Sequence, residues 1–236
     1  MSVFSYHIVK TSYDLVFKTL LLPPKASNTP GLIHAECMTM MTLGSNIFSR
    51  SRMLLKQLVV FAQWENEEAI DHFLAKDKLG VVLSGGWHTR MLFLRQWGTI
   101  SKIKLPQASV ELDENAPVVA VTLARMKLPE IPRFIRWGRP VEKLVRDHPE
   151  TTLALASIRL PRTVSTFSIW KSQKAMTDMV HGHSQVHHPE RHVNAMKERN
   201  RKDFHLEFTT LRFRPLSEWG AWNGRSDYIP KPNSGN

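Results

Sequence analysis

The histidine-rich segment HGHSQVHHPERH (181–192) holds the residues best suited to chemistry. It contains five of the eleven histidines of the chain within twelve positions. A neutral imidazole binds metal ions, and its ordinary pKa also lets it exchange protons near neutral pH. If the protein has a reactive centre, we expect it in this segment.

Two histidine pairs in this segment have a spacing that could chelate a divalent ion. His183 and His187 are four residues apart, as are His188 and His192, so either pair could bind zinc if it were helical. Pro189 opposes one continuous helix through both pairs, and no nearby Cys or Asp completes a ligand set. The alternative is a solvent-exposed loop whose histidines bind nothing.

The elements around this segment would hold it in place. TVSTFSIW (163–170) alternates like a half-buried strand, and a helix with Ser172 as its N-cap follows. Pro189 suits the first turn of a second helix that runs to about Asp203. HLEFTTLRF (205–213) predicts a strand with Leu206, Phe208, Thr210 and Arg212 on one face.

The first half of the chain predicts the order βαββαβ. Its expected strands are 3–10, 31–43, 56–64 and 89–98, and its expected helices are 13–22, capped by Ser12, and 66–82. A polar, basic connection covers 45–52. After a polar linker (104–117), acidic at Glu111, Asp113 and Glu114, the same order returns with a strand over 117–126, a helix over 132–147 and a strand over 151–160.

Matching tryptophans indicate an internal duplication. Trp64 and Trp170 each end a strand 106 residues apart, whereas Trp97 and Trp219 each precede a glycine 122 residues apart. The second copy therefore carries about sixteen extra residues, and the histidines lie among them. We interpret all four tryptophans as core residues.

We predict an α+β fold of two tandem ferredoxin-like βαββαβ repeats that form an intrachain dimeric-type α+β barrel. The repeats are 1–112 and 113–236, and the second one carries the histidine-rich insertion. A single unit would leave one sheet face uncovered, so the two sheets should pack face to face with the helices outside.

Composition narrows the functional class. The chain has no stretch of about 20 apolar residues and a single cysteine, Cys37, so we expect a cytoplasmic protein and a buried thiol. No P-loop, GxSxG, GxGxxG or HExxH motif is present.

The net charge of +11 is spread along the chain, and no nucleic-acid recognition module accompanies it, so nucleic acid is not an expected partner. The densest basic stripe consists of Arg133, Arg136, Arg139, Lys143 and Arg146. It is either a solvated helix face or a site of peripheral contact with an anionic membrane.

Several segments resemble the spheroidene monooxygenase family of purple bacteria, which oxidises carotenoids. They are TFSIW (166–170), Ala175-Met176, Gly182-His183, the helix of His192, the final strand with its Trp-Gly ending, and RFIRWGRPV (133–141). The resemblance implies a haem b cofactor with its iron, molecular oxygen as co-substrate, and a carotenoid or other long apolar substrate. It identifies no electron donor.

The resemblance also implies the haem ligand. Counted back from the final strand, His192 falls on the histidine of the family's last helix, and His183 corresponds to its Gly-His. The segment 184–191 departs from the family as an insertion and puts the shape of the pocket in question. The competing hypothesis is a non-catalytic α+β-barrel protein that binds a small hydrophobic ligand.

Overall fold

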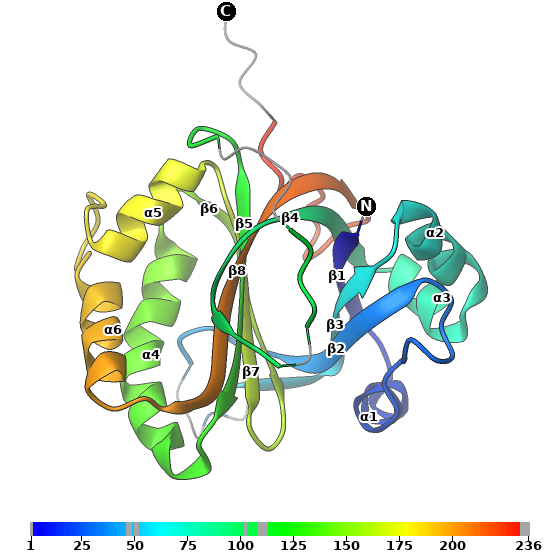
Figure 1. Cartoon of the computed structure of the whole chain (residues 1–236), viewed down its shortest axis with the longest axis horizontal. Helices are drawn as coiled ribbons and strands as arrows, with labels where there is room; N and C mark the ends of the chain where they lie inside the picture. The colour runs from blue at the N-terminus through cyan, green and yellow to red at the C-terminus, as the bar shows by residue number, and fades with distance from the viewer. Residues whose placement is uncertain (1, 46–48, 50–51, 102, 108–112, 232–236) are drawn as a thin grey trace, which may run out of the picture.

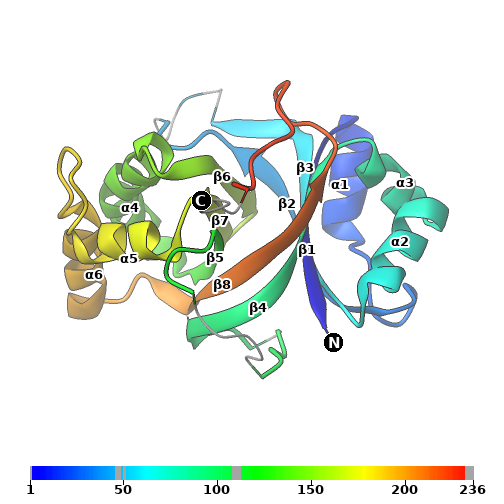
Figure 2. The same cartoon turned by 90° about the horizontal axis from the view of Figure 1, so that it is seen from above.

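Eight antiparallel strands close into a barrel, with helices on two opposite sides (Figures 1 and 2). The description rests on a computed structural model and covers residues 2–45, 49, 52–101, 103–107 and 113–231. Of the predicted connection 45–52, only residues 45, 49 and 52 are described, and the linker residue Glu111 lies outside the described residues. The predicted α+β class is confirmed.

The first half supplies four strands and three helices. Ser12 caps α1 as predicted, by accepting from the backbone N–H of Leu15. The elements are β1 (Val3–Lys10), α1 (Tyr13–Leu21), β2 (Leu32–Met41), β3 (Met53–Trp64), α2 (Glu67–Lys76), α3 (Lys78–Ser84) and β4 (Trp87–Thr99).

The second half supplies the other four strands. Ser172 caps α5 as predicted, through the N–H of Ala175. The elements are β5 (Val118–Met126), a 3-10 turn (Leu128–Glu130), α4 (Ile131–Asp147), β6 (Thr151–Arg159), β7 (Thr163–Trp170), α5 (Gln173–His181), α6 (Arg191–Arg201) and β8 (His205–Trp219).

The strand order around the barrel is β1-β3-β2-β6-β7-β5-β8-β4. The first four strands therefore run β4-β1-β3-β2 and the last four run β8-β5-β7-β6. The halves join where β2 pairs with β6 and where β4 pairs with β8. Helices α1 to α3 cover one side of the barrel and α4 to α6 cover the other (Figure 1).

Aromatic side chains fill the interior of the barrel. Tyr6 stacks on Phe167 with ring centroids 4.0 Å apart, and Phe4 lies 4.9 Å from Phe213. All four are fully buried within one cluster of inward-facing residues from both halves. The interior is therefore a hydrophobic core to which both halves contribute.

Side chains close both ends of this core. At one end, Trp222 and Tyr228 of the C-terminal segment pack on the cluster, and the Tyr228 hydroxyl donates to the Trp222 carbonyl at 2.6 Å. At the other end, the 2% exposed carboxylate of Glu36 pairs with Arg159 at 2.7 Å and with Arg125 at 3.3 Å.

Two predicted helix boundaries are wrong. The single helix expected over 66–82 is two helices, because Asp77 has an extended backbone and its carboxylate accepts from the N–H groups of Leu79 and Gly80. Pro189 does not lie in the first turn of α6 but precedes Glu190, the residue that flanks the helix.

The predicted basic stripe lies on α4 but is partly neutralised. Arg133 pairs with Glu130 and Glu198, at 2.7 and 2.6 Å. Arg139 and Arg146 donate to backbone carbonyls at 2.9 and 3.1 Å, those of Gly44 and Leu43. None of the helices in the described part of the chain combines the length and apolarity needed to cross a membrane.

The interpretation of the tryptophans as core residues is correct for one pair only. Trp64 and Trp170 are each 1% exposed. Trp97 is half-buried and Trp219 is 39% exposed; Arg95 and Arg212 stack on Trp97, and Arg90 stacks on Trp219. Cys37 is fully buried, as predicted, and burial raises the pKa of its thiol to about 12.

Candidate functional site

The histidine-rich segment joins α5 to α6. Gly182 ends α5 with φ of 77°, a left-handed conformation that favours glycine, and residues 183–190 form no helix before α6 begins at Arg191. About half of the sixteen extra residues expected in the second half lie here, since nine residues separate α5 from α6 and a single residue separates α2 from α3. His181 thus ends one helix, and His192 is the second residue of the next.

His192 is held in one tautomer. Its Nδ1 lies 2.9 Å from the carbonyl oxygen of Val180, and because a carbonyl only accepts, Nδ1 carries the proton. The other nitrogen, Nε2, therefore keeps its lone pair. Burial lowers the pKa of His192, the Val180 carbonyl partly offsets this, and nearby His181 lowers it further, so the ring is neutral at physiological pH.

The chemistry of this donor fits a haem iron. An axial imidazole has to be neutral, with one nitrogen available and the other hydrogen-bonded so that the ring direction is fixed. His192 meets these conditions. The neighbouring layer between α5 and the sheet is already occupied by side chains, those of Trp170, Met176, Met179 and Leu94.

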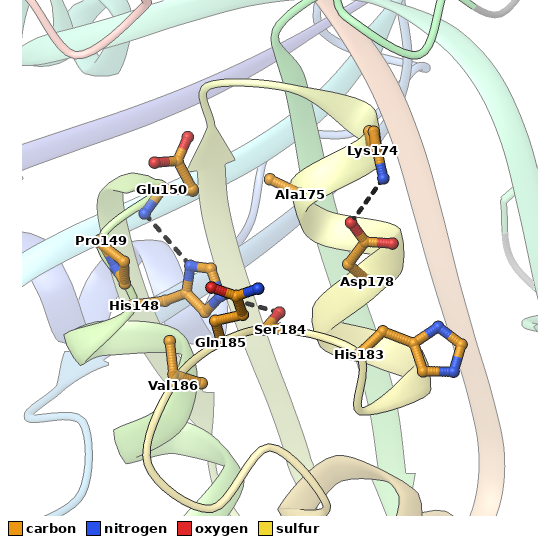
Figure 3. Close-up of a pocket in the computed structure, with 10 residues that line it drawn as sticks. All are labelled: His148, Pro149, Glu150, Lys174, Ala175, Asp178, His183, Ser184, Gln185 and Val186. Carbon is orange, nitrogen blue, oxygen red and sulfur yellow. Dashed lines mark hydrogen bonds and ion pairs between the residues drawn. The ribbon is translucent and has the colours of Figure 1, made fainter.

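The other histidines of the segment have no such support. His183 is exposed and its ring points away from the neighbouring side chains (Figure 3). His188 has φ of 59° and pairs with exposed Glu190 at 3.3 Å, while its ring lies 3.9 Å from that of His187. Without a helix over 183–190, the four-residue spacing no longer brings either predicted zinc pair onto one face. The described residues contain no group of three or more metal-ligating side chains.

An open depression of about 630 Å³ lies beside α5 (Figure 3). His183 is one of its lining residues and His192 is not. The remaining lining residues are mostly polar: His148, Pro149, Glu150, Lys174, Ala175, Asp178, Ser184, Gln185 and Val186. This composition is unsuitable for a long apolar ligand.

His148 at this depression is a residue that sequence reasoning missed. The N–H of Glu150 donates to its Nδ1 at 3.2 Å, so Nε2 carries the proton and donates to the Ser184 hydroxyl at 3.1 Å. Burial lowers the pKa of His148, and the ring is neutral with both nitrogens engaged. It anchors the histidine-rich segment to the start of β6. The His-Pro dipeptide between a helix and a strand was the available signal.

Comparison with known proteins supports the fold. No family model and no curated protein matches the sequence. Among solved structures, an aldoxime dehydratase superposes with a TM-score of 0.53 at 11% identity, covering 92% of this chain and 84% of that one. At this identity, the likeness shows a shared fold and nothing further.

Two other solved structures are less similar. A candidate monooxygenase from Fusobacterium nucleatum subsp. nucleatum has a TM-score of 0.41 at 8% identity, covering 95% of this chain and 96% of that chain. A haem-degrading enzyme from Listeria monocytogenes has a TM-score of 0.29 at 10% identity, covering 88% and 98%. These values are too low to support an argument.

Proposed function

We propose that the protein is a haem-dependent monooxygenase of the spheroidene monooxygenase type, which uses molecular oxygen to oxidise a carotenoid or another long apolar substrate. The observation that carries the proposal is the state of His192. Its ring is neutral, its Nδ1 proton is donated to the Val180 carbonyl at 2.9 Å, and Nε2 is left as a ligand. The sequence resemblance implicates the same residue.

Haem b, when bound, supplies the oxygen chemistry, and the chain supplies the ligand and the surroundings. His192 is the residue that would hold the iron, with Val180 fixing the direction of its ring. The buried side chains of Trp170, Met176 and Met179 would exclude water from the adjoining layer. Among the described residues we assign no electron donor site.

We also infer that the two halves are tandem ferredoxin-like repeats of a dimeric-type α+β barrel. The matching orders β4-β1-β3-β2 and β8-β5-β7-β6 support this inference. The aldoxime dehydratase shares this fold, so the scaffold is compatible with an enzyme of that kind.

The packing restricts where haem could bind. The barrel interior is filled, and the depression beside α5 excludes His192 from its lining. The support for haem binding is therefore the state of the His192 ring, and not a preformed space beside it.

Titration of the purified full chain with hemin tests the proposal through its absorption spectrum. We expect a saturable Soret band in the wild type, loss of that band in His192→Ala, and retention in His183→Ala, the matched control. Circular dichroism checks that both variants remain folded. Loss of the band in His183→Ala alone would indicate that His183, in the loop between α5 and α6, is the iron ligand. A wild-type protein that stays colourless would favour the alternative, a non-catalytic barrel that binds a small hydrophobic ligand.

A further inference from the structure

Arg212 on β8 is a buried cation without a carboxylate partner among the described residues. Its residue exposure is 8%, and its Nη1 donates to the hydroxyl of Thr177 on α5 at 3.3 Å. Its guanidinium stacks 4.2 Å from the centre of the Trp97 ring. Burying a charge is costly unless a counter-charge is present, so the missing carboxylate needs an explanation.

The first half of the barrel contains the equivalent arginine. The pairing of β4 with β8 is symmetric about its centre. Trp219 on β8 lies opposite His88, and Trp97 on β4 lies opposite Thr210. Two residues along from each tryptophan partner, Arg90 lies opposite Ser217 and Arg212 lies opposite Arg95. Arg90 is 6% exposed and stacks 4.3 Å from the centre of the Trp219 ring. The two arginines thus occupy matching places in the two halves.

Their helix partners differ in charge. Arg90 pairs with Asp71 and, at 3.1 Å, with Glu67, both on α2. The helices α2 and α5 begin alike, with the caps Asn66 and Ser172 each accepting from an alanine N–H three residues later. Counted from these caps, Glu67 corresponds to Gln173 and Asp71 corresponds to Thr177. The second half therefore keeps the arginine and replaces both carboxylates with neutral groups.

A second arginine increases the positive charge at Arg212. Arg95 on β4 lies directly opposite Arg212 on β8, whereas the residue opposite Arg90 is the neutral Ser217. Like charges in directly opposite positions destabilise a sheet. Burial lowers the pKa of Arg212 to about 10, and the charge of Arg95 lowers it as well. Arg95 is exposed, so the pair extends from the buried layer to the surface.

We propose that Arg212 and Arg95 form an oxyanion-binding site. A carboxylate or phosphate group of a ligand would pair with Arg212 there, as Glu67 and Asp71 pair with Arg90 in the first half. An arginine fork binds such groups in a bidentate manner, and Trp97 holds the Arg212 fork in place. Thr177 and Gln173 add neutral hydrogen-bonding groups, which tolerate an anion where an aspartate would repel it. This inference is independent of haem binding.

Thermal unfolding of the full chain tests the site with two probes, inorganic phosphate and acetate, each compared with chloride at equal ionic strength. We expect a saturable rise in Tm with at least one probe. A response to phosphate alone identifies a phosphate-bearing ligand, and a response to acetate alone identifies a carboxylate. Titration calorimetry with the responding probe then gives an affinity.

Thr177→Asp rebuilds the acidic partner that the first half has. We expect this variant to have a higher Tm in chloride and a probe affinity about tenfold weaker or worse, because the new carboxylate occupies the Arg212 fork. Gln185→Glu adds the same charge at an exposed position and should leave the probe response unchanged. Arg90→Gln should lower Tm while keeping the response.

Two results would overturn the proposal. One is a wild-type Tm that is the same in phosphate, acetate and chloride. The other is an undiminished probe response in Thr177→Asp, which would place the anion elsewhere on this basic surface. Neither result depends on Arg212 variants, whose folding could fail for reasons of packing.

Discussion

Trp64 and Trp170 occupy the same position in the two halves of the barrel. Trp64 ends β3 opposite Val3, the first residue of β1, and Trp170 ends β7 opposite Val118, the first residue of β5. Each indole N–H donates to a serine hydroxyl, that of Ser5 at 2.8 Å and that of Ser168 at 2.9 Å. Each ring packs beneath the helix that follows, so each anchors one helix layer to the barrel.

Truncating either anchor should cost the protein much of its stability. Because both rings are 1% exposed, we expect Trp64→Ala and Trp170→Ala each to lower the free energy of unfolding by about 3–5 kcal/mol. Urea denaturation measures the change. Trp219→Ala is the control at a 39% exposed position and should cost about 1 kcal/mol. Equal losses in all three variants would contradict the assignment of the anchors.

The strand and helix pattern was predictable because its signals are local. Alternation over Thr163–Trp170 and the caps Ser12 and Ser172 gave boundaries within a residue or two of those observed. The break at Asp77 was missed because 66–82 keeps a helical pattern across it, and only the capping geometry of the aspartate interrupts the backbone. The exposure of Trp219 was missed because sequence shows no difference between core and stacked tryptophans.

Glu36 holds the charged end of the barrel together. Burial raises the pKa of this carboxyl, but the His34 hydrogen bond and the charges of Arg159 and Arg125 outweigh burial and hold the pKa below its usual range. Glu36→Gln leaves Arg159 without a carboxylate among the described residues, whereas Arg125 keeps Glu207, so we expect a loss of about 3 kcal/mol in urea denaturation.

An exposed ion pair provides the comparison for Glu36. Glu150 pairs with Lys171 at 3.3 Å, and their side chains are 40% and 50% exposed. Glu150→Gln should change the free energy of unfolding by less than about 1 kcal/mol. A similarly small effect of Glu36→Gln would mean that the two arginines find other partners.

His88 should make the stability of the protein dependent on pH in the acid range. Burial and the charge of Arg90 lower its pKa to about 4, against the opposing effect of Asp71. Below about pH 6.5 the His88 imidazole binds a proton in the unfolded state but not yet in the folded state. The free energy of unfolding therefore falls as the pH drops, and it levels off below the folded pKa. At about pH 5 this loss amounts to about 2 kcal/mol.

Urea denaturation of His88→Phe at neutral pH and at about pH 5 checks this effect. The phenyl ring can keep the stacking on His7 and Trp219, whose ring centroids lie 4.9 and 5.0 Å from that of His88. We expect the variant to lose the part due to His88, about 2 kcal/mol of the difference between the two pH values. A loss of similar size should remain from His7, which is fully buried and has its pKa lowered by burial, His88 and Arg90. His72→Phe, at an exposed position on α2, should behave as the wild type does.

The histidine-rich segment shows why the site was less predictable than the fold. The composition of 181–192 drew attention to this segment, yet the state of His192 depends on the Val180 carbonyl, which belongs to the preceding helix. The anchoring of Ser184 by His148 joins positions 36 residues apart. No local pattern encodes such contacts, because they arise only when α5 and the start of β6 are packed together. His192 as a haem ligand stays a prediction.

The last prediction concerns membrane contact through α4. Of the five cations proposed for it, Arg133, Arg139 and Arg146 are engaged within the chain, whereas Arg136 and Lys143 have no ion pair among the described residues. We therefore expect these two to carry any attraction to an anionic bilayer. At about 1 kcal/mol for each basic residue near the surface, Arg136→Ala with Lys143→Ala should weaken binding to phosphatidylserine vesicles by about 30-fold. Co-sedimentation measures this at low and high salt, since screening should reduce the wild-type signal.

Replacing the exposed Lys18 and Lys25 with alanine removes the same charge from the opposite side of the barrel, where α1 lies (Figure 1). If the two double variants lose binding equally, the attraction comes from net charge and α4 is not a docking face.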